Sequence, residues 1–360
     1  MLVWPTKKAL ILKSKTPDKI LNVVPSAKSF SVKGQPLVAV PHRTEETTLL
    51  RNMGYDAPAP IRSYYNWPGR FTPFHAQREA AAFLSMNKRA FNLSELGTGK
   101  SLASLWAYDY LRSIGQMNKA LVISPLSTLE RTWADEIFQH FPHLTYTVLH
   151  GAKDKRIKLL KEDFDVYIIN HDGVGIIEPH LKDRTDIDLV IVDEIAQCAR
   201  NASTTRWRKI NTVVNKHKAP RACWGMSGTP TPNAPTDAWA QCRLVVPDAV
   251  PPYFNRFKGQ VMKQLSQFQW IAKKGATETV REVMQPSVRF TRDECLDLPP
   301  LMYETRAVAL TKDQGKAYKE MVAKLRIQAD EGDITAVNEA VKMGKLVQIA
   351  CGVVYATDGS

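Results

Sequence analysis

Cysteine is scarce in this chain, and its spacing gives it no evident structural role. The five cysteines of the 360 residues lie far apart, without a Cys-x-x-Cys pair or a matching histidine cluster. This spacing argues against a disulfide framework of the kind found in small secreted domains, and equally against a zinc site. We therefore expect a protein of a reducing cytoplasm. The five cysteines are Cys198, Cys223, Cys242, Cys295 and Cys351.

Long apolar runs are absent as well. No stretch approaches the roughly 20 residues that a membrane-spanning helix needs. Near the N-terminus, the apolar run that follows Lys8 ends at Lys13, which is too short for the core of a signal peptide. We expect a soluble, intracellular protein with no membrane partner, and a nucleoid-associated or phage protein in a prokaryotic cytoplasm fits this description.

Acidic residues are outnumbered by basic ones. The chain has 49 Lys and Arg against 36 Asp and Glu, a net charge of +13, and no acid at all occurs from Ile195 to Thr236. A surface of this kind attracts polyanions, with nucleic acid as the first candidate; a merely solvated surface is the alternative interpretation. The basic residues of the acid-free stretch are Arg200, Arg206, Arg208, Lys209, Lys216, Lys218 and Arg221.

The apolar runs that are present predict an α/β fold. From Pro73 onwards, short apolar runs alternate with segments of helix length, which is typical of a parallel sheet covered by helices on both faces. Ligand sites in such sheets lie at the carboxyl ends of the strands. Helices are expected over 74–86 and from Lys100, and strands over 90–93, 120–123, 165–169, 189–192 and 222–226.

Composition divides the chain into five parts. Residues 1–60 alternate β-prone runs with proline and glycine and predict a small, basic, β-rich accessory domain, and residues 61–72 form a linker. Residues 73–246 are expected to form a nucleotide-binding lobe. A helical bridge over 247–300 leads into 301–360, the beginning of a further lobe with a strand at 304–310 and a helix from Lys312.

A glycine-rich segment follows the strand expected at 90–93. Its glycines let backbone N–H groups approach phosphate oxygens, Lys100 can reach the β- and γ-phosphates, and Ser101 can bind Mg²⁺. A full Walker A motif would have glycine at position 94, where this chain has Ser94. The segment predicts a site for ATP and Mg²⁺ formed by Glu95, Leu96, Gly97, Thr98, Gly99, Lys100 and Ser101.

Two acids follow the strand expected at 189–192. Asp193 can join the Mg²⁺ shell, and Glu194 can orient and deprotonate an attacking water. A P-loop kinase needs no such glutamate, and a GTPase would need an Asn-Lys-x-Asp motif that the sequence lacks. Lys100, Asp193 and Glu194 are therefore the catalytic candidates.

A turn with two hydroxyls follows the strand expected at 222–226. Ser227 and Thr229 would lie at the same sheet edge as Asp193, where hydroxyls can sense the γ-phosphate. Without the other motifs, Ser-Gly-Thr-Pro would be an ordinary turn.

In this order the motifs resemble those of the Swi/Snf-type ATPases of helicase superfamily two. Gln77 matches the adenine-reading glutamine of that family. The segment from Ser124 through Trp133 and Glu136 resembles motif Ia. The other matching segments are 95–101 (motif I), 170–172 (motif Ib), 193–196 with 200–201 (motif II), 227–233 (motif III), and 289–300 with 310–314 (the bridge into the second lobe).

The resemblance implies a complete first RecA-like lobe that hydrolyses ATP when stimulated by DNA and tracks along duplex without separating its strands. Protein partners remain unspecified. The DNA-binding residues that it implies are Ser124, Pro125, Ser127, Asn170, His171, Arg200 and Asn233.

Two departures from the family pattern affect the expected activity. Ala196 stands where the family usually has a histidine thought to connect the nucleotide to the other lobe. The 360 residues also stop before motifs IV, V and VI, whose arginine fingers accelerate phosphoryl transfer by a factor of about 10³ or more. We expect a truncated second lobe, so that the missing part is needed in cis or in a longer parent chain.

Three local patterns have two interpretations each. Ser127 and Glu130 form a capping box at a helix start, and the same helix end could hold a DNA phosphate. Trp207 either packs on the core, as its helical spacing indicates, or stacks on a base. Tyr65 and Trp67 either pack the linker on the lobe or lie beside the adenine.

Three functions are compatible with the sequence. The first is an ATP-dependent translocase or remodelling motor on duplex DNA. The second is a helicase that separates strands or remodels forks in DNA or RNA. The third is a half-motor that binds ATP or DNA without turnover on its own.

Overall fold

The computed structural model describes residues 1–181, 184–219, 221–267, 269–295, 302, 304–330 and 336–352, with the side chains of 324–330 and 336–342 left aside. Contacts within the chain define two compact units, Met1–Leu298 and Pro299–Ser360. Among these described residues, no helix is long and apolar enough to cross a membrane.

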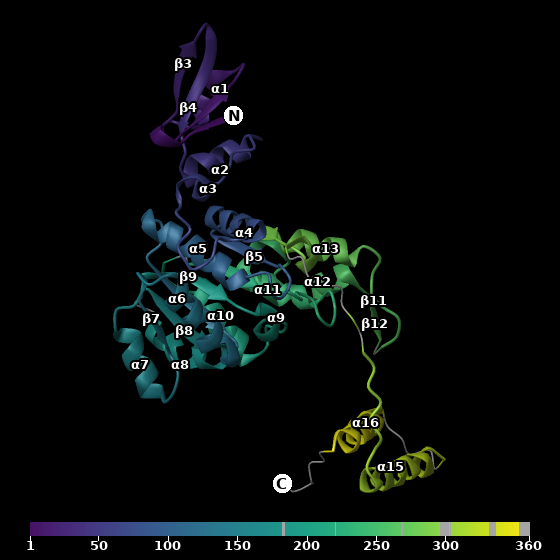
Figure 1. Ribbon diagram of the computed structural model, residues 1–360. Helices are drawn as coiled ribbons and strands as arrows, with labels where there is room; N and C mark the ends of the chain where they lie inside the picture. Colours follow the sequence, from purple (N-terminus) through teal and green to yellow (C-terminus); the bar gives the residue numbers. More distant parts are fainter. Residues whose placement is uncertain are drawn as a thin grey trace. The chain divides into compact units, whose positions relative to one another are not determined.

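A seven-stranded parallel sheet is the centre of the first unit (Figure 1). Its strand order is β13-β5-β10-β9-β6-β8-β7, and each neighbouring pair is parallel. The predicted α/β fold is thus confirmed. The strands are β5 (Arg89–Asn92), β6 (Lys119–Ser124), β7 (Tyr146–Val148), β8 (Val166–Asn170), β9 (Ile187–Val192), β10 (Ala222–Met226) and β13 (Ser287–Val288).

Helices cover both faces of this sheet because its strands are apolar on both sides. Val122 and Ile191 point into one core, which also contains Trp106 and Trp133, whereas Leu121 and Val190 point into the other. The first core is closed by α4 (His75–Met86), α5 (Lys100–Ser113), the π-helical turn η3 (Leu129–Ala134) and α6 (Asp135–His140). The second is closed by α7 (Lys153–Lys161), α8 (Val174–Ile177), α9 (Ile195–Cys198), α10 (Thr205–Asn215), α11 (Asp237–Val245), α12 (Phe254–Val261) and α13 (Ala276–Val283).

Short elements complete the connections of the first unit. An antiparallel pair, β11 (Met262–Gln264) with β12 (Trp270–Ala272), interrupts the region that the sequence predicts as helical after Pro247. The remaining short elements are η1 (Pro5–Lys7), α3 (Ile61–Tyr64), η2 (Leu126–Thr128), η4 (His171–Gly173), η5 (Glu178–Leu181), η6 (Pro247–Ala249) and α14 (Arg292–Cys295).

The N-terminal residues form a four-stranded antiparallel sheet of order β1-β2-β4-β3. Its own small core includes Leu10, Ile20, Val40 and Leu50, all fully buried. The elements are β1 (Leu2–Trp4), β2 (Ala9–Lys13), α1 (Pro17–Val23), β3 (Lys28–Val32), β4 (Gln35–Pro41) and α2 (Thr44–Asn52).

The segment after this sheet packs on the lobe, as one of its two interpretations predicts. The Tyr65 hydroxyl donates to Asp109 Oδ2 at 2.5 Å. The ring of Trp67 meets that of Trp106 edge to face, with 6.0 Å between their centroids. Both residues are partly buried and therefore pack against the core of the lobe.

The described residues of the second unit form two helices, α15 (Lys312–Asp330) and α16 (Ala336–Cys351). Gln314 Nε2 donates to the carbonyl oxygen of Ile349 at 3.3 Å, which ties the start of α15 to the end of α16. The strand predicted at 304–310 is wrong, because residues 304–311 have no regular structure. An alternating apolar pattern makes a strand only where a neighbouring strand accepts its backbone hydrogen bonds.

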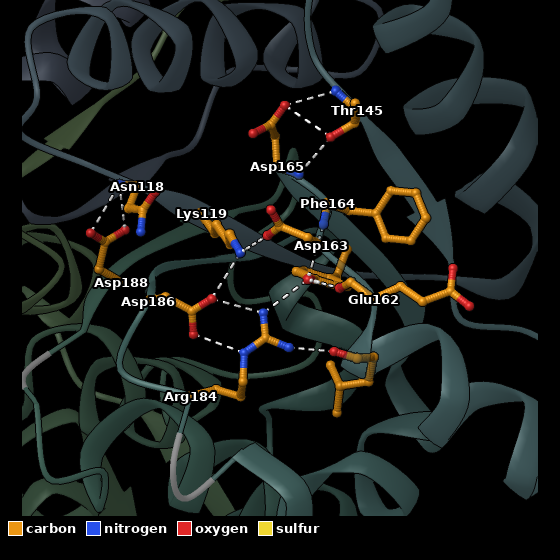
Figure 2. Close-up of polar contacts among 12 residues, drawn as sticks. Asn118, Lys119, Thr145, Glu162, Asp163, Phe164, Asp165, Arg184, Asp186 and Asp188 are labelled. Carbon is orange, nitrogen blue, oxygen red and sulfur yellow. Dashed lines mark hydrogen bonds and ion pairs between the residues drawn. The ribbon is translucent and has the colours of Figure 1, made fainter.

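Ion pairs join the amino ends of β6 and β9 (Figure 2). The glycine-rich loop follows the carboxyl end of β5, so these pairs lie at the opposite edge of the parallel sheet. Arg184 Nε and Nη2 donate to Asp186 Oδ1 and Oδ2 at 2.8 and 2.9 Å. Lys119 Nζ lies 3.0 Å from Asp186 Oδ2 and also pairs with Asp163. The network consists of two cations and two anions, and each cation pairs with an anion. This pairing favours a structural role.

Replacing Asp186 by Asn should lower the free energy of unfolding at pH 7 by about 1 kcal/mol, less than a buried charged pair would give, because this pair is partly exposed. Hydrogen bonds from the Arg184 guanidinium hold the pKa of Asp186 well below its usual range, with help from Lys119. Such a carboxylate stabilises the fold above about pH 4 and ceases to do so as the pH falls towards its lowered pKa.

Urea unfolding at pH 7 and in acid measures this effect. The difference between D186N and the unchanged chain should be present at pH 7 and shrink below about pH 4. Asp163→Asn is the matched control, because the Asp163 side chain is 88% exposed and its loss should change little. Equal stabilities of D186N and the unchanged chain at pH 7 would contradict the structural role.

Candidate active site

The glycine-rich loop connects β5 to α5. Gly97 and Gly99 have φ angles of 83° and 78°, in the left-handed region that favours glycine. A Cβ atom at position 99 would lie 2.1 Å from Gln77 Nε2, so the side chain of Gln77 closes over the loop. The predicted adenine-reading residue is thus next to the predicted phosphate loop, although Gln77 is 22 positions away from Gly99 in sequence.

Lys100 is the cation of this site, and it is almost completely buried. Its Nζ donates to the carbonyl oxygen of Glu95 at 3.0 Å. Burial lowers the pKa of Lys100, while the nearby carboxylates of Glu194 and Asp193 act in the opposite direction. Ser101, in the first turn of α5, remains partly exposed.

The other members of the loop differ in accessibility. Thr98 is buried, and its hydroxyl donates to the Glu95 carbonyl oxygen at 2.8 Å. Leu96 and Gly97 are exposed at the tip. A Cβ atom at Gly228 would lie 3.2 Å from the Leu96 backbone nitrogen, so the turn after β10 lies directly against the loop.

Asp193 follows β9, and its carboxylate is held from two sides. Oδ2 accepts hydrogen bonds from the Ser124 hydroxyl at 2.9 Å and from Trp133 Nε1 at 3.0 Å. Oδ1 accepts from the backbone N–H of Glu194 at 3.0 Å. Three donors of this kind fix the orientation of the carboxylate.

Glu194 has a left-handed backbone conformation, with φ at 45°. Its Oε2 lies 3.5 Å from the Ser227 hydroxyl, so the turn after β10 reaches the carboxylate. Burial and then the charge of Asp193 raise the pKa of Glu194, and Lys100 acts against this rise. Thr229 is exposed, and its backbone N–H donates to Ser227 Oγ at 3.2 Å.

A third carboxylate, Glu136 of α6, lies near Asp193. Its Oε2 is buried and has no hydrogen-bond partner among the described residues. Burial, with a further contribution from Asp193, raises the pKa of Glu136 to about 8. Sequence reasoning includes Glu136 only as part of a motif resemblance, since a polar residue on a short helix carries no separate signal.

The residues of the site fit a Mg²⁺-bound nucleotide. The described part of the chain contains no group of three or more His, Cys, Asp or Glu side chains that could hold a metal ion alone. Mg²⁺ in ATPases is usually bound by one or two protein oxygens together with substrate phosphates. Ser101 and Asp193 could supply two such oxygens, and the buried Glu136 Oε2 beside them has no hydrogen-bond partner among the described residues.

Ser94, which departs from the Walker A pattern, connects the loop to the bridge segment. Its hydroxyl accepts from the Phe290 N–H at 3.2 Å, and Glu95 N donates to the Phe290 carbonyl oxygen at 2.9 Å. Glu95 Oε2 accepts from the Arg292 N–H at 3.0 Å. Glycine at position 94 would lose the first of these bonds. No local sequence signal indicates contacts across almost 200 residues.

The predicted DNA-binding residues separate into exposed and buried groups. Ser127, Arg200 and Asn233 are exposed, and Pro125 is partly exposed. Ser124 is fully buried against Asp193, so its side chain is not exposed for a direct DNA contact in this structure.

Two residues of the predicted motif Ib are also engaged within the protein. His171 is 6% exposed, and its Nε2 lies 2.8 Å from the Asp193 carbonyl oxygen. Burial lowers its pKa. Asn170 Oδ1 accepts from Arg156 Nη1 at 3.2 Å. The His171 side chain therefore contacts the Asp193 backbone and is not exposed for a direct DNA contact in this structure.

Fewer basic side chains of the acid-free stretch are exposed than its composition indicates. Arg221 is 2% exposed and donates to four backbone carbonyl oxygens, among them those of Ile187 and Val213. Arg206 pairs with Asp172, and Lys209 pairs with Glu178. The basic residues of this stretch that remain exposed are Arg200, Arg208, Lys216 and Lys218.

Two of the local patterns are decided by the structure. Trp207 is partly buried and donates from Nε1 to the Ala240 carbonyl oxygen at 2.9 Å, which confirms the core interpretation. The capping box of Ser127 and Glu130 is wrong, since the helix starts here have no side-chain cap. The Thr128 hydroxyl instead donates to the Pro125 carbonyl oxygen at 3.0 Å.

This arrangement of motifs around a parallel sheet is shared with known proteins. The SNF2-related domain matches residues 77–350 of the chain. The chain belongs to this family. The resemblance to Swi/Snf-type ATPases is therefore confirmed, and the chain contains the ATPase core characteristic of the SNF2-related family.

Individual relatives are more distant. Putative protein p41 of Acyrthosiphon pisum secondary endosymbiont phage 1 is 27% identical over 301 residues, which cover 80% of this chain and 65% of the phage protein. The ISWI chromatin-remodeling complex ATPase ISW2 of Saccharomyces cerevisiae is 30% identical over 160 residues, or 43% of this chain and 14% of that protein. The chain thus spans less than two thirds of either relative.

A solved structure shares the fold. The Sulfolobus solfataricus SWI2/SNF2 ATPase core in complex with dsDNA matches with a TM-score of 0.52 at 21% identity, over 79% of this chain and 59% of that chain. The predicted RecA-like lobe is confirmed by this likeness.

Proposed function

We propose that this SNF2-related chain is the nucleotide-binding part of a motor that hydrolyses ATP while it translocates along duplex DNA or remodels DNA–protein complexes. The observation that carries the proposal is the convergence of Lys100, Asp193 and Glu194 at the carboxyl ends of β5 and β9. A buried ammonium opposite two carboxylates suits phosphate binding and water activation in one place.

Each residue of the site has one role in the proposed reaction. The backbone N–H groups of the loop and the Lys100 ammonium bind the β- and γ-phosphates, and Gln77 recognises the adenine. Ser101 and Asp193 hold Mg²⁺, which neutralises phosphate charge when bound. Glu194 orients a water and accepts its proton as the water oxygen attacks the γ-phosphorus and ADP leaves.

The hydroxyls after β10 complete the proposed nucleotide site. Ser227 already reaches Glu194, and the exposed Thr229 lies two residues further along the same turn. We assign them to sensing the γ-phosphate, since Gly228 of the same turn contacts the phosphate loop.

The proposed DNA track uses the exposed members of the predicted set. Pro125, Ser127, Arg200 and Asn233 follow the carboxyl ends of β6, β9 and β10, on the same sheet edge as the nucleotide site. Arg200 lines a hollow of 350 Å³ between η4 and α10. Contacts of this kind would bind phosphates without reading sequence.

In the proposed motor, the chain keeps the five parts that the sequence predicts: 1–60, 61–72, 73–246, 247–300 and 301–360. The last part would begin the second lobe that completes the site. ATP and DNA meet in the cytoplasm of a prokaryotic or phage-infected cell, which is the compartment we propose.

Phosphate release by the 360-residue chain, with and without closed duplex DNA, tests the proposal. Duplex should raise the rate, and displacement of a third strand from a triplex should accompany hydrolysis. Lys100→Ala is the control that should abolish both. Unwinding of a forked substrate would indicate a strand-separating helicase. Binding of ATP and DNA without release, restored by adding a second lobe, would indicate a half-motor.

A further inference from the structure

A basic hollow lies on the N-terminal sheet, outside residues 77–350 that match the SNF2-related domain. The hollow has a volume of 330 Å³. Its walls include four cationic side chains, and part of its floor is formed by small or apolar residues of β2 and β4. The cations are Lys7, Lys8, Lys28 and Arg43.

Antiparallel pairing brings these distant residues together. Ala9 at the start of β2 pairs with Pro41 at the end of β4, and Lys28 at the start of β3 pairs with Ala39. The turn before β2, the start of β3 and the residues after β4 therefore meet at one end of the sheet. Arg43 follows β4 at this same end.

The lysines of the hollow are not neutralised by the protein. Within residues 1–60, all of which are described, no carboxylate pairs with Lys7, Lys8 or Lys28. Arg43 Nη1 lies 4.0 Å from Glu46 Oε1, and its side chain is 74% exposed. The same Glu46 oxygen accepts from Ser26 Oγ at 3.0 Å. One shared carboxylate leaves the hollow strongly positive.

Hydrogen bonds hold the wall of the hollow in place. His42 Nδ1 lies 2.9 Å from the Tyr64 hydroxyl, and His42 Nε2 lies 2.8 Å from the Pro58 carbonyl oxygen. Lys8 Nζ lies 5.8 Å from the centre of the Tyr64 ring. Burial lowers the pKa of His42, so this residue contributes shape and the lysines and arginine contribute the charge.

We propose that the hollow binds backbone phosphates of duplex DNA, as a second anchoring site beside the track on the nucleotide-binding lobe. The inference rests on the proposed DNA partner. Exposed Lys and Arg side chains gathered on one face are the electrostatic footprint of nucleic-acid binding. Phosphate contacts carry no sequence information, so the hollow holds the motor on its track without selecting a sequence.

The test compares two double variants of the full 360-residue chain that remove the same charge from the same sheet. K8A/K28A removes two of the cationic side chains that line the hollow. K13A/K33A is the control, because Lys13 ends β2 and Lys33 follows β3 at the opposite end of the sheet. Binding of a fluorescent blunt DNA duplex is followed by anisotropy over a salt titration, and ATP binding is followed separately.

K8A/K28A should bind the duplex about tenfold more weakly. Its negative slope of log affinity against log salt should become shallower by roughly 1.8, which is about 0.9 for each lost phosphate contact. K13A/K33A should keep the slope of the unchanged chain, and neither variant should change ATP affinity. Circular dichroism establishes that both variants fold, with Lys8→Gln and Lys28→Gln as single substitutions if K8A/K28A does not.

Two outcomes would overturn the hollow as a DNA site: an unchanged salt slope in K8A/K28A, or equal losses in both double variants. Failure of the unchanged chain to bind duplex DNA is a different result, since it removes the DNA partner from the proposed function itself.

Discussion

The Glu194→Gln variant should keep ATP bound and almost stop hydrolysing it, with a loss of about 10² to 10⁴ in rate. The amide keeps the size of the side chain and its reach to Ser227, but it cannot accept the proton of the attacking water. Lys100, Ser101 and Asp193 are untouched, so phosphate binding should survive. Quench-flow measurement of phosphate release at saturating ATP and duplex DNA gives the rate, and a fluorescent nucleotide gives the affinity.

Glu162→Gln is the matched control for this prediction. Glu162 is exposed and follows α7, before the amino end of β8, so the same loss of one negative charge occurs at the edge of the sheet away from the nucleotide. This control should release phosphate at the unchanged rate. Hydrolysis by E194Q at that rate would remove Glu194 from the reaction and, with it, the water-activating part of the proposal.

Trp133→Phe should raise the Mg²⁺ concentration needed for half-maximal hydrolysis by roughly 10- to 100-fold, the usual effect of losing a group that orients a metal ligand. Trp133 is fully buried, and its indole N–H donates to Asp193 Oδ2. Phenylalanine preserves most of the apolar contact but leaves that oxygen with the Ser124 hydroxyl alone. In this prediction Trp133 acts through Asp193, as a positioning residue.

Trp106→Phe separates this role from a general loss of stability. Trp106 is also fully buried in the same core, and its Nε1 donates to the Pro68 carbonyl oxygen at 2.8 Å, away from Asp193. Both variants should unfold at similarly reduced denaturant concentrations, whereas only W133F should change the Mg²⁺ requirement. A parallel shift of Mg²⁺ requirement in both variants would show that the effect comes from the core as a whole.

Local patterns were sufficient to predict the centre of the proposed nucleotide site. The strand, glycine loop and helix around Lys100 are consecutive in the chain, and Asp193 directly follows an apolar run. Their arrangement needs only the rule that parallel strands present their carboxyl ends at one edge. The strand predicted at 304–310 is wrong because a strand also needs a neighbouring strand, and the local pattern does not specify that neighbour.

Charge counting predicted less well which basic residues are available. Arg221 belongs to the most basic stretch of the chain, yet it is buried and donates to backbone carbonyl oxygens from segments up to 40 positions away. Buried carbonyl groups need donors, and a guanidinium can satisfy several of them at once. Composition counts the charge of Arg221, but it does not show that buried carbonyl groups need Arg221 as a hydrogen-bond donor.

The order of residues along the chain was enough to predict the α/β class and to locate the glycine-rich loop and the pair of acids after β9, because each depends on neighbours in sequence. Tertiary packing alone placed the Trp133 N–H and the Ser124 hydroxyl on Asp193, buried His171 beneath it, and joined Ser94 to Phe290. Packing also gathered Lys7, Lys8, Lys28 and Arg43 around one hollow. These contacts join residues far apart in the chain, and only the folded path of the backbone determines which of them meet.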